Sequence, residues 1–216
     1  MDSKIIQLAK QSGYDAAALL AFIEVETGGK GFDAATGKIL IQFEPSWFKK
    51  IAKNELLRYN SLKSKLAVNE KITTVEQTFI HNWEFVTGNK VSVQILEWQA
   101  FNIAFAINPN AAMQSTSIGL GQIMGFHWKR LGYTSVGAMW DDAKKGIEFQ
   151  VKQLIKFIST DARLQKAIKL NDWSTVASIY NGAGYKELAK RIGREPYDIS
   201  MAKAFDKYSK LLQNNN

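Results

Sequence analysis

The pattern of apolar and polar positions is most unusual near the N-terminus, where eight apolar residues follow one another from Ala16 to Ile23. A helix over this run has no polar face, so the pattern predicts a helix from about Asp15 to Glu26 that is buried on all sides. Two carboxylates, Glu24 and Glu26, close this helix, and Gly28-Gly29 follows them. Because glycine readily adopts the left-handed conformation that ends helices, we expect the helix to stop here.

A carboxyl group at the end of a buried helix loses part of its hydration, which raises its pKa. A carboxyl group that stays protonated near neutral pH can serve as a general acid. The alternative is that Glu24 and Glu26 are ordinary solvated residues of a last helical turn. The spacing of apolar residues alone leaves both interpretations open.

Only one stretch has a clear strand pattern. Residues 39–43 are rich in strand formers and follow a Thr36-Gly37 turn, which predicts a β-hairpin around that turn, closed by Glu44-Pro45. The rest of the chain has helical periodicity or polar connections. The predicted helices cover residues 3–11, 47–52, 74–86, 92–107, 136–159, 161–170, 173–180, 186–191 and 199–212. Three of them have a start signal: Ser46 is the expected N-cap of the second, a capping box at Thr73 precedes the third, and Ser92 opens the fourth. Residues 60–71 are expected to be a solvated loop or a weak helix.

The chain has 216 residues, 46% of them hydrophobic, and contains neither an internal repeat nor a proline- or serine-rich linker. These features predict one mainly α domain over residues 1–216, with a small β-hairpin inserted between helices. The absence of cysteine excludes a disulfide framework and a cysteine nucleophile. The N-terminal residues lack the apolar region of a signal peptide, so we expect synthesis in a host cytoplasm without a leader.

The formal charge of +8 favours polyanionic partners, such as nucleic acid, anionic lipid or acidic wall polymers. Three short stretches carry glycine beside hydrogen-bonding side chains, a combination that regular helices do not require. They are residues 26–29 with the following 42–44, residues 115–125, and residues 180–185. Each one alone could be an ordinary turn between helices. Together they suggest a binding groove.

Glu26 and Glu44 are the candidate carboxylates of this groove, because glycosidases commonly use one protonated and one ionised carboxyl group. The neutral side chains nearby in these stretches suit sugar hydroxyl and acetamido groups. The candidate substrate-binding residues are Gln42, Ser117, Gln122, Met124, Tyr180 and Asn181. A metal site is not expected, because His81 and His127 are the only histidines and no His-Glu-x-x-His pair occurs.

Four blocks in this order resemble the N-acetylmuramidase family of phage endolysins, which is related to goose-type lysozyme and the lytic transglycosylases. The blocks are Glu26-Thr27-Gly28-Gly29-Lys30-Gly31-Phe32, Phe43-Glu44-Pro45-Ser46-Trp47-Phe48, the Ser-x-Ser-x-Gly-x-x-Gln-x-Met-Gly block of residues 115–125, and Tyr180-Asn181-Gly182-Ala183-Gly184-Tyr185. The resemblance spans about residues 14–208. The chain departs from the family pattern at Pro45, where a basic residue is usual, at Ile118, where tryptophan is usual, and over residues 54–91.

The resemblance implies a lysozyme-like α+β fold and cleavage of bacterial peptidoglycan glycan strands at the bond that follows N-acetylmuramic acid. It implies that Glu26 is the general acid and that Glu44 is a second carboxylate, which activates water or stabilises positive charge on the sugar ring. We expect a monomer that uses no cofactor and reaches the cell wall or periplasm through a membrane pore. Its basic charge could also contact anionic wall or outer-membrane polymers.

Three other functions are compatible with parts of the sequence. A lytic transglycosylase would share the fold but close an anhydro ring instead of adding water, and Glu44 argues for hydrolysis. A non-catalytic wall-binding module would share the groove. A nucleic-acid-binding domain would explain the charge, but the sequence has no helix-turn-helix pattern with clustered arginine, so we expect no nucleic-acid partner.

Overall fold

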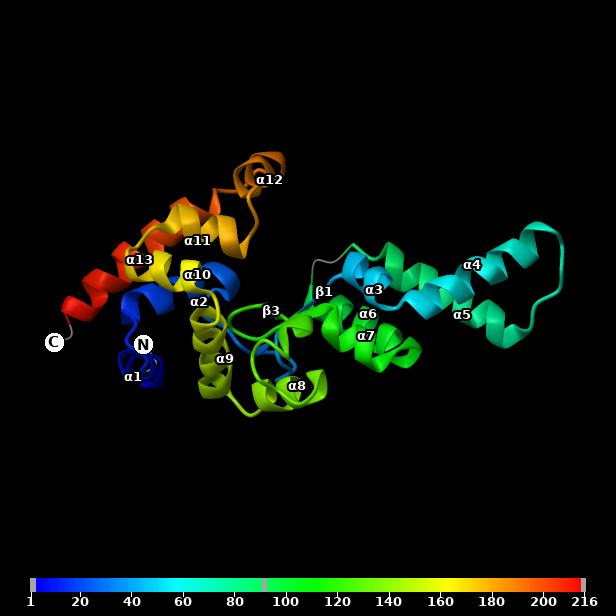
Figure 1. The fold of residues 1–216 in the computed structure, drawn as a ribbon, viewed down its shortest axis with the longest axis horizontal. Coiled ribbons are helices and arrows are strands. Elements are labelled where there is room, and N and C mark those ends of the chain that lie inside the picture. The colour runs from blue at the N-terminus through cyan, green and yellow to red at the C-terminus, as the bar shows by residue number, and fades with distance from the viewer. Residues whose placement is uncertain (1–2, 91–92, 215–216) are drawn as a thin grey trace. The chain divides into compact units, whose positions relative to one another are not determined.

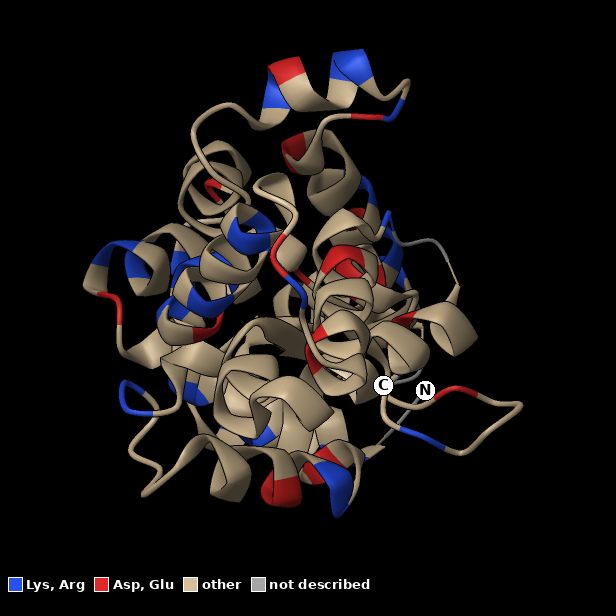
Figure 2. Ribbon diagram, turned by 90° about the vertical axis from the view of Figure 1, so that its right-hand side faces the viewer, with Lys and Arg blue, Asp and Glu red and all other residues tan. Residues whose placement is uncertain are grey.

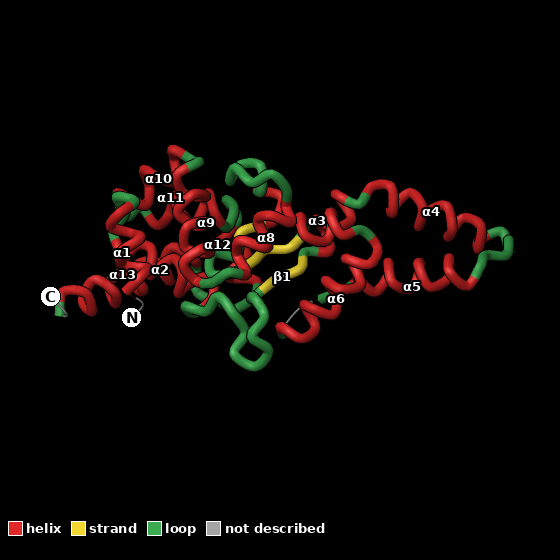
Figure 3. Tube along the Cα trace, turned by 90° about the horizontal axis from the view of Figure 1, so that it is seen from below, coloured by secondary structure: helices red, strands yellow, loops and turns green. Residues whose placement is uncertain are grey.

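The computed structural model describes residues 3–90 and 93–214, and this part of the chain is mainly α-helical with one small antiparallel sheet (Figure 3). The chain divides into two compact units. Unit 1 is drawn from residues 1–32, 119–121 and 143–216, and unit 2 from residues 33–118 and 122–142. The mainly α fold class with a small hairpin between helices, expected from the sequence, is confirmed.

Unit 1 is built around helix α2 (Ala16–Thr27), in which all eight residues from Ala16 to Ile23 are buried. A helix with no polar face is stable in water only when other elements surround it. Helix α13 (Tyr197–Gln213) packs along α2, and α1 (Ser3–Gln11) packs against it as well (Figure 1). The other helices of unit 1 are α9 (Ile147–Ser159), α10 (Ala162–Lys169), α11 (Trp173–Tyr180) and α12 (Tyr185–Arg191).

Aspartate side chains fix where three helices of unit 1 begin. Asp15 accepts a hydrogen bond from the backbone N–H of Ala17 at 2.7 Å, and Asp161 and Asp172 cap α10 and α11 in the same way. Such caps satisfy N–H groups that have no partner within the helix. These starts agree with the sequence prediction.

The sheet belongs to unit 2 and has the order β1-β2-β3, with β1 (Ile41–Phe43), β2 (Thr116–Ile118) and β3 (Ile123–Met124). The predicted turn at Thr36-Gly37 forms, with the N–H of Gly37 donating to the carbonyl of Asp33 at 2.8 Å. The predicted hairpin extends only one step beyond this turn, where the N–H of Asp33 donates to the carbonyl of Lys38 at 2.8 Å, because residues 41–43 (β1) pair with β2 instead. The hairpin of the structure is β2–β3, within the stretch that the sequence pattern treated only as a break between helices.

The remaining elements of unit 2 are α3 (Pro45–Ile51), α4 (Lys53–Ala67), α5 (Thr74–Gly88), α6 (Gln94–Ile107), α7 (Pro109–Gln114), the 3₁₀ turn η1 (Gly125–His127) and α8 (Val136–Lys144), whose last two residues fall in unit 1. Ser46 is not the cap of α3, since Pro45 is already helical and Glu44 occupies the N-cap position. Proline suits the first helical position because its φ is fixed near the helical value. The proposed opening at Ser92 lies outside the described residues.

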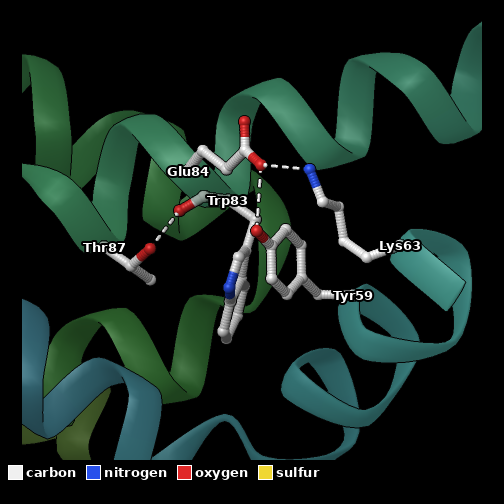
Figure 4. Close-up of polar contacts among 5 residues, drawn as sticks. All are labelled: Tyr59, Lys63, Trp83, Glu84 and Thr87. Carbon is white, nitrogen blue, oxygen red and sulfur yellow. Dashed lines mark hydrogen bonds and ion pairs between the residues drawn. The ribbon is translucent and has the colours of Figure 1, made fainter. Parts of the chain in front are cut away.

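Helices α4 and α5 lie side by side (Figure 1), so most of residues 60–71 are helical rather than loop. Tyr59 stacks on Trp83 with ring centroids 5.9 Å apart, and its hydroxyl donates to Glu84 at 2.9 Å (Figure 4). Lys63 donates to the same carboxylate at 3.2 Å. The capping box at Thr73, predicted from the sequence, starts α5. Aromatic contacts therefore order a segment whose lysine-rich sequence left both a solvated loop and a weak helix open.

The predicted long helix over residues 136–159 is two helices, α8 and α9. Gly146 lies between them with φ 148° and ψ 175°. Glycine adopts this conformation readily because it has no Cβ, whereas other residues do so rarely. The apolar periodicity on both sides of Gly146 concealed the break.

Lysine and arginine positions occur on several helices, with acidic positions among them (Figure 2). Over the described ranges 3–90 and 93–214, none of the helices combines the length and the apolar character needed to cross a membrane.

Gly125 is required by close packing in unit 2. A Cβ atom at this position would come within 2.0 Å of the backbone carbonyl oxygen of Met113. We expect Gly125→Ala to lower the free energy of unfolding in urea by about 2 kcal/mol or more, because the backbone must shift. The matched control is Gly137→Ala in α8, where the nearest atom is 3.6 Å away. It should leave stability unchanged or raise it by up to about 1 kcal/mol; equal stability of both variants would contradict the packing argument.

Candidate active site

Glu26 lies in the last turn of helix α2. Gly28 stops the helix with φ 63° and ψ 27°, and its N–H donates to the carbonyl of Glu24 at 2.8 Å. This left-handed cap is the one that the Gly28-Gly29 pair predicts. Glu26 is therefore attached to a rigid and otherwise buried element.

The carboxyl group of Glu26 meets aromatic residues rather than a cation. The hydroxyl of Tyr197 in α13 donates a hydrogen bond to Oε1 of Glu26. Phe22, one turn earlier in α2, lies edge-on to Tyr197 and to Tyr180, with centroid distances of 6.5 and 4.5 Å. Burial removes water from the carboxyl group and raises the pKa of Glu26 to about 7, while the hydrogen bond from Tyr197 acts in the opposite direction. Of the two interpretations that the sequence leaves open, this environment agrees with a carboxyl group that has lost part of its hydration.

Glu24 has a different environment, although it is only two residues away. Lys207 in α13 donates to its carboxylate at 2.7 Å, and Tyr208 also hydrogen-bonds it. Partial burial acts to raise the pKa of Glu24, but the contacts with Lys207 and Tyr208 outweigh it, and the pKa lies below the ordinary value. The pKa values of the two glutamates are therefore shifted in opposite directions, and Glu26 holds its proton to a higher pH than Glu24 does.

Gln150 positions the short segment 119–121 in unit 1. Its Oε1 accepts from the N–H of Leu120 at 2.9 Å, and its Nε2 donates to the carbonyl of Ala143 at 3.0 Å. The side chain is only 2% exposed. A Cβ at Gly31 would come within 2.2 Å of the same Oε1, so a larger residue there would displace the side chain of Gln150. Gln150 lies three residues after Ile147 and four before Leu154, so helical periodicity could have indicated a buried polar residue.

Two further hydroxyl groups reach segment 119–121. Thr27, which follows Glu26, donates to the carbonyl of Leu120 at 3.3 Å. Tyr180 donates to the carbonyl of Gly121. Tyr180 is thus brought to the neighbourhood of Glu26 through Phe22, whereas Asn181 is an exposed residue at the C-cap of α11.

In unit 2, the sheet aligns three of the predicted substrate-binding residues. Gln42 of β1 is opposite Ser117 of β2, and Ser117 is opposite Met124 of β3. Cross-strand partners project on the same face of a sheet, so the three side chains form one row. The hydroxyl of Ser117 also donates to Oε1 of Gln122 at 2.9 Å, which adds Gln122 to this group.

Glu44 follows β1 directly and joins the same row. The amide of Gln42 donates to its Oε1 at 2.9 Å. Partial burial raises the pKa of Glu44 above its ordinary value, and the hydrogen bond from Gln42 acts against this shift. Five predicted residues are thus together in unit 2, while Glu26 and Tyr180 are together in unit 1.

The sequence interpretation missed two residues of α6 that hold β1. Both polar atoms of the Gln94 side-chain amide bond the backbone of Ile41: the N–H of Ile41 donates to Oε1 at 3.0 Å, and Nε2 donates to the carbonyl of Ile41 at 2.8 Å. Glu97 is 3% exposed and accepts from the N–H of Phe43 at 2.7 Å. Burial raises the pKa of Glu97 to about 7; the Phe43 N–H lowers it, and the nearby Glu44 raises it further. In the sequence, the only indication that Glu97 is buried is its position one helical turn before the apolar residue Phe101.

The histidines do not resemble ligands. His81 is exposed on α5, and burial lowers the pKa of His127 to about 4, with Arg130 contributing to the shift. In the part of the chain that the structure describes, no group of three or more His, Cys, Asp or Glu side chains could hold a metal ion.

Comparisons with known proteins cover this whole set of residues. A family model described as Muramidase, N-acetylmuramidase, matches residues 15–209. The chain is also similar to the crystal structure of Burkholderia AP3 phage endolysin, with 27% identity and a TM-score of 0.69 over 98% of this chain and 71% of that chain. No curated protein sequence matches the chain significantly.

The tyrosine that touches Glu26 tunes its proton affinity. Because the Tyr197 hydroxyl donates to the carboxylate form, Tyr197→Phe should raise the pKa of Glu26 further above about 7, by up to roughly one pH unit. Titration of the side-chain carboxyl carbon by NMR measures this shift. The control is Tyr208→Phe, whose hydroxyl bonds Glu24 instead; it should raise the pKa of Glu24 and leave that of Glu26 in place. A fall in the Glu26 pKa in Tyr197→Phe would contradict the assigned hydrogen bond.

Proposed function

Because the chain belongs to the N-acetylmuramidase family and is thus a peptidoglycan-cleaving enzyme, we propose that it hydrolyses the β-1,4 bond between N-acetylmuramic acid and N-acetylglucosamine. The observation that carries this proposal is a glutamic acid, Glu26, at the end of a buried helix with a pKa of about 7. Glycoside hydrolysis needs such a protonated carboxyl group, because the leaving sugar oxygen must receive a proton.

Glu26 is the general acid in this proposal. Its proton passes to the bridging oxygen while the bond from that oxygen to C1 of the muramic acid breaks. The departing sugar leaves as an alcohol, and positive charge develops on the remaining ring. A pKa of about 7 matches the acid to the task, since a group of pKa 4.5 would already have lost its proton near neutral pH.

Glu44 is the second carboxylate. It either accepts the proton of the water molecule that attacks C1 or stabilises the positive charge on the ring. In both cases one water molecule is added across the broken bond. Burial raises the pKa of Glu44 above its ordinary value, and the hydrogen bond from Gln42 acts against this shift by stabilising the ionised form that both roles need.

The row of Gln42, Ser117 and Met124, with Gln122, provides the groups that we propose bind the glycan in unit 2. Tyr180 and Asn181 have the same proposed role in unit 1. Hydroxyl and amide groups can both donate to and accept from sugar hydroxyl and acetamido groups. We propose that residues 1–216 act as a single catalytic domain, as a monomer without a cofactor, on bacterial cell walls, and that anionic wall polymers add an electrostatic contact to the basic chain.

Replacing Glu26 by glutamine removes the proposed acid without a change of size. Digestion of purified sacculi should fall by about a hundredfold or more, because general acid catalysis contributes on that scale, while the thermal unfolding midpoint stays near that of the parent protein. Glu24→Gln is the matched control on the same helix, and it should digest sacculi at close to the parent rate. A folded Glu26→Gln protein with normal activity would falsify the assignment.

Replacing Glu44 by glutamine tests the second carboxylate. We expect an activity loss of about tenfold or more, with the fold retained. Glu84→Gln on α5 of the same unit removes an exposed carboxylate and should leave digestion unchanged.

The masses of the released muropeptides decide between hydrolysis and transglycosylation. With the parent protein, products that carry one added water support hydrolysis. Products lighter by one water identify a lytic transglycosylase and remove the proposed water-activating role of Glu44. A protein that binds sacculi but releases no product would instead be a wall-binding module.

A further inference from the structure

A pocket of unit 2 lies outside the row of candidate site residues and has an unusual lining. It has a volume of about 350 Å³ and is formed by α6 and the turn before β1. Its lining includes one indole ring, two isoleucines, one ammonium group and three amides, of which Gln94 belongs to the wall next to β1; the other groups belong to Trp98, Ile95, Ile103, Lys38, Gln99 and Asn102.

These side chains suit one class of ligand. The indole and the isoleucines can cover the apolar face of a sugar ring. Gln99 and Asn102 are exposed on α6, and each offers both a donor and an acceptor for hydroxyl or acetamido groups. A small number of convergent polar groups around an apolar surface is typical of a binding pocket.

Lys38 gives this pocket a positive charge, which favours a negatively charged ligand. Its ammonium group lies 5.1 Å from the centre of the Trp98 ring. Within the described residues it forms no ion pair with a carboxylate. An ammonium group that has no carboxylate partner within the protein can pair with a carboxylate of a ligand, and such charge-assisted hydrogen bonds are stronger than neutral ones.

Two other pockets lack this combination. The pocket between α4, α5 and α6 also has a cation over an aromatic ring, since Arg58 lies 4.2 Å from the centre of the Phe79 ring, but its lining includes the carboxylate of Glu55. The pocket at the α2–α13 contact contains Lys207, which is paired with Glu24 at 2.7 Å. Among these three pockets, only the pocket of Trp98 has a cation beside an aromatic ring and no carboxylate in its lining.

The same pocket is linked to the strand that carries candidate site residues. Gln94 forms part of its wall and bonds the backbone of Ile41, which precedes Gln42 in β1. A ligand in this pocket would contact α6 on the side of β1 that faces away from β2. The pocket and the row Gln42, Ser117 and Met124 thus share one strand as a common support.

We propose that the Trp98 pocket is a second, non-catalytic binding site for an N-acetylated sugar that carries a carboxylate, as muropeptides do. The choice of sugar rests on the proposed function, but binding here requires no cleavage. Such a site would hold a further part of the wall polymer while the candidate site acts on the glycan.

The test uses N-acetylmuramyl-L-alanyl-D-isoglutamine, which contains one sugar and one carboxylate and has no sugar–sugar bond to cleave. Titration of the full chain followed by NMR should shift the side-chain amide signals of Gln99 and Asn102. Lys38→Gln should weaken binding by about tenfold, and Gln99→Ala with Asn102→Ala should also weaken it. Lys71→Gln, an exposed lysine of unit 2 away from the pocket, is the matched control and should bind as the parent does.

Several outcomes would overturn the proposal. Unchanged Gln99 and Asn102 signals at millimolar probe exclude the site, and equal affinity of Lys38→Gln and the parent excludes the role of the cation. Equally tight binding of the neutral N-acetylglucosamine trimer excludes selection for a carboxylate. Because Glu26→Gln should bind the probe normally, loss of catalysis and loss of this binding site are separate results.

Discussion

The burial of α2 on every side is the constraint on which unit 1 depends. No face of residues Ala16 to Ile23 can remain in water, so the helix must be enclosed by segments from distant parts of the chain. One consequence is a contact between Glu26 and Tyr197, residues that are 171 positions apart in the sequence. The carboxyl group thus loses water through the same packing that stabilises the unit. Its proton affinity is a property of the core and not of a neighbouring charge.

Polar side chains that bond to the backbone hold the rest of the candidate site. Gln150 fixes segment 119–121, while Gln94 and Glu97 fix β1. Gln150 and Glu97 are buried and Gln94 is partly buried, and each bonds to main-chain groups, which makes its geometry well defined. Very short strands and turns have few ladder hydrogen bonds of their own, so side chains provide the missing ones.

The sequence predicted the features that depend on local patterns. The buried helix with its Gly28 cap, the capping box at Thr73 and the aspartate starts of α10 and α11 all follow from neighbouring residues. The strand pairing failed because the partner of β1 lies 75 residues later, in the register Gln42 with Ser117, and strands of two or three residues leave almost no periodic signal. The break at Gly146 failed for the opposite reason, since strong periodicity on both sides masked one glycine.

The residues of the candidate site also fall into those that short sequence motifs indicate and those that only contacts between distant parts of the chain reveal. Glu26, Glu44 and the row residues could be proposed from the sequence because they occur in short motifs, and the structure places the members of each unit together. Tyr197, Gln150 and Glu97 were missed because their importance arises from contacts across the chain. A polar residue on an apolar helical face was the available indication for two of them, whereas Tyr197 had none.

The contacts of α6 with β1 also limit how this protein can associate. The N–H and carbonyl of Ile41 and the N–H of Phe43 are the main-chain groups that an added strand would need, and all three are already engaged by Gln94 and Glu97. An extended peptide therefore cannot form these three main-chain hydrogen bonds along this side of β1. The sheet is closed to β-augmentation there, and the unfolding of α6 would be needed before two molecules could polymerise through it.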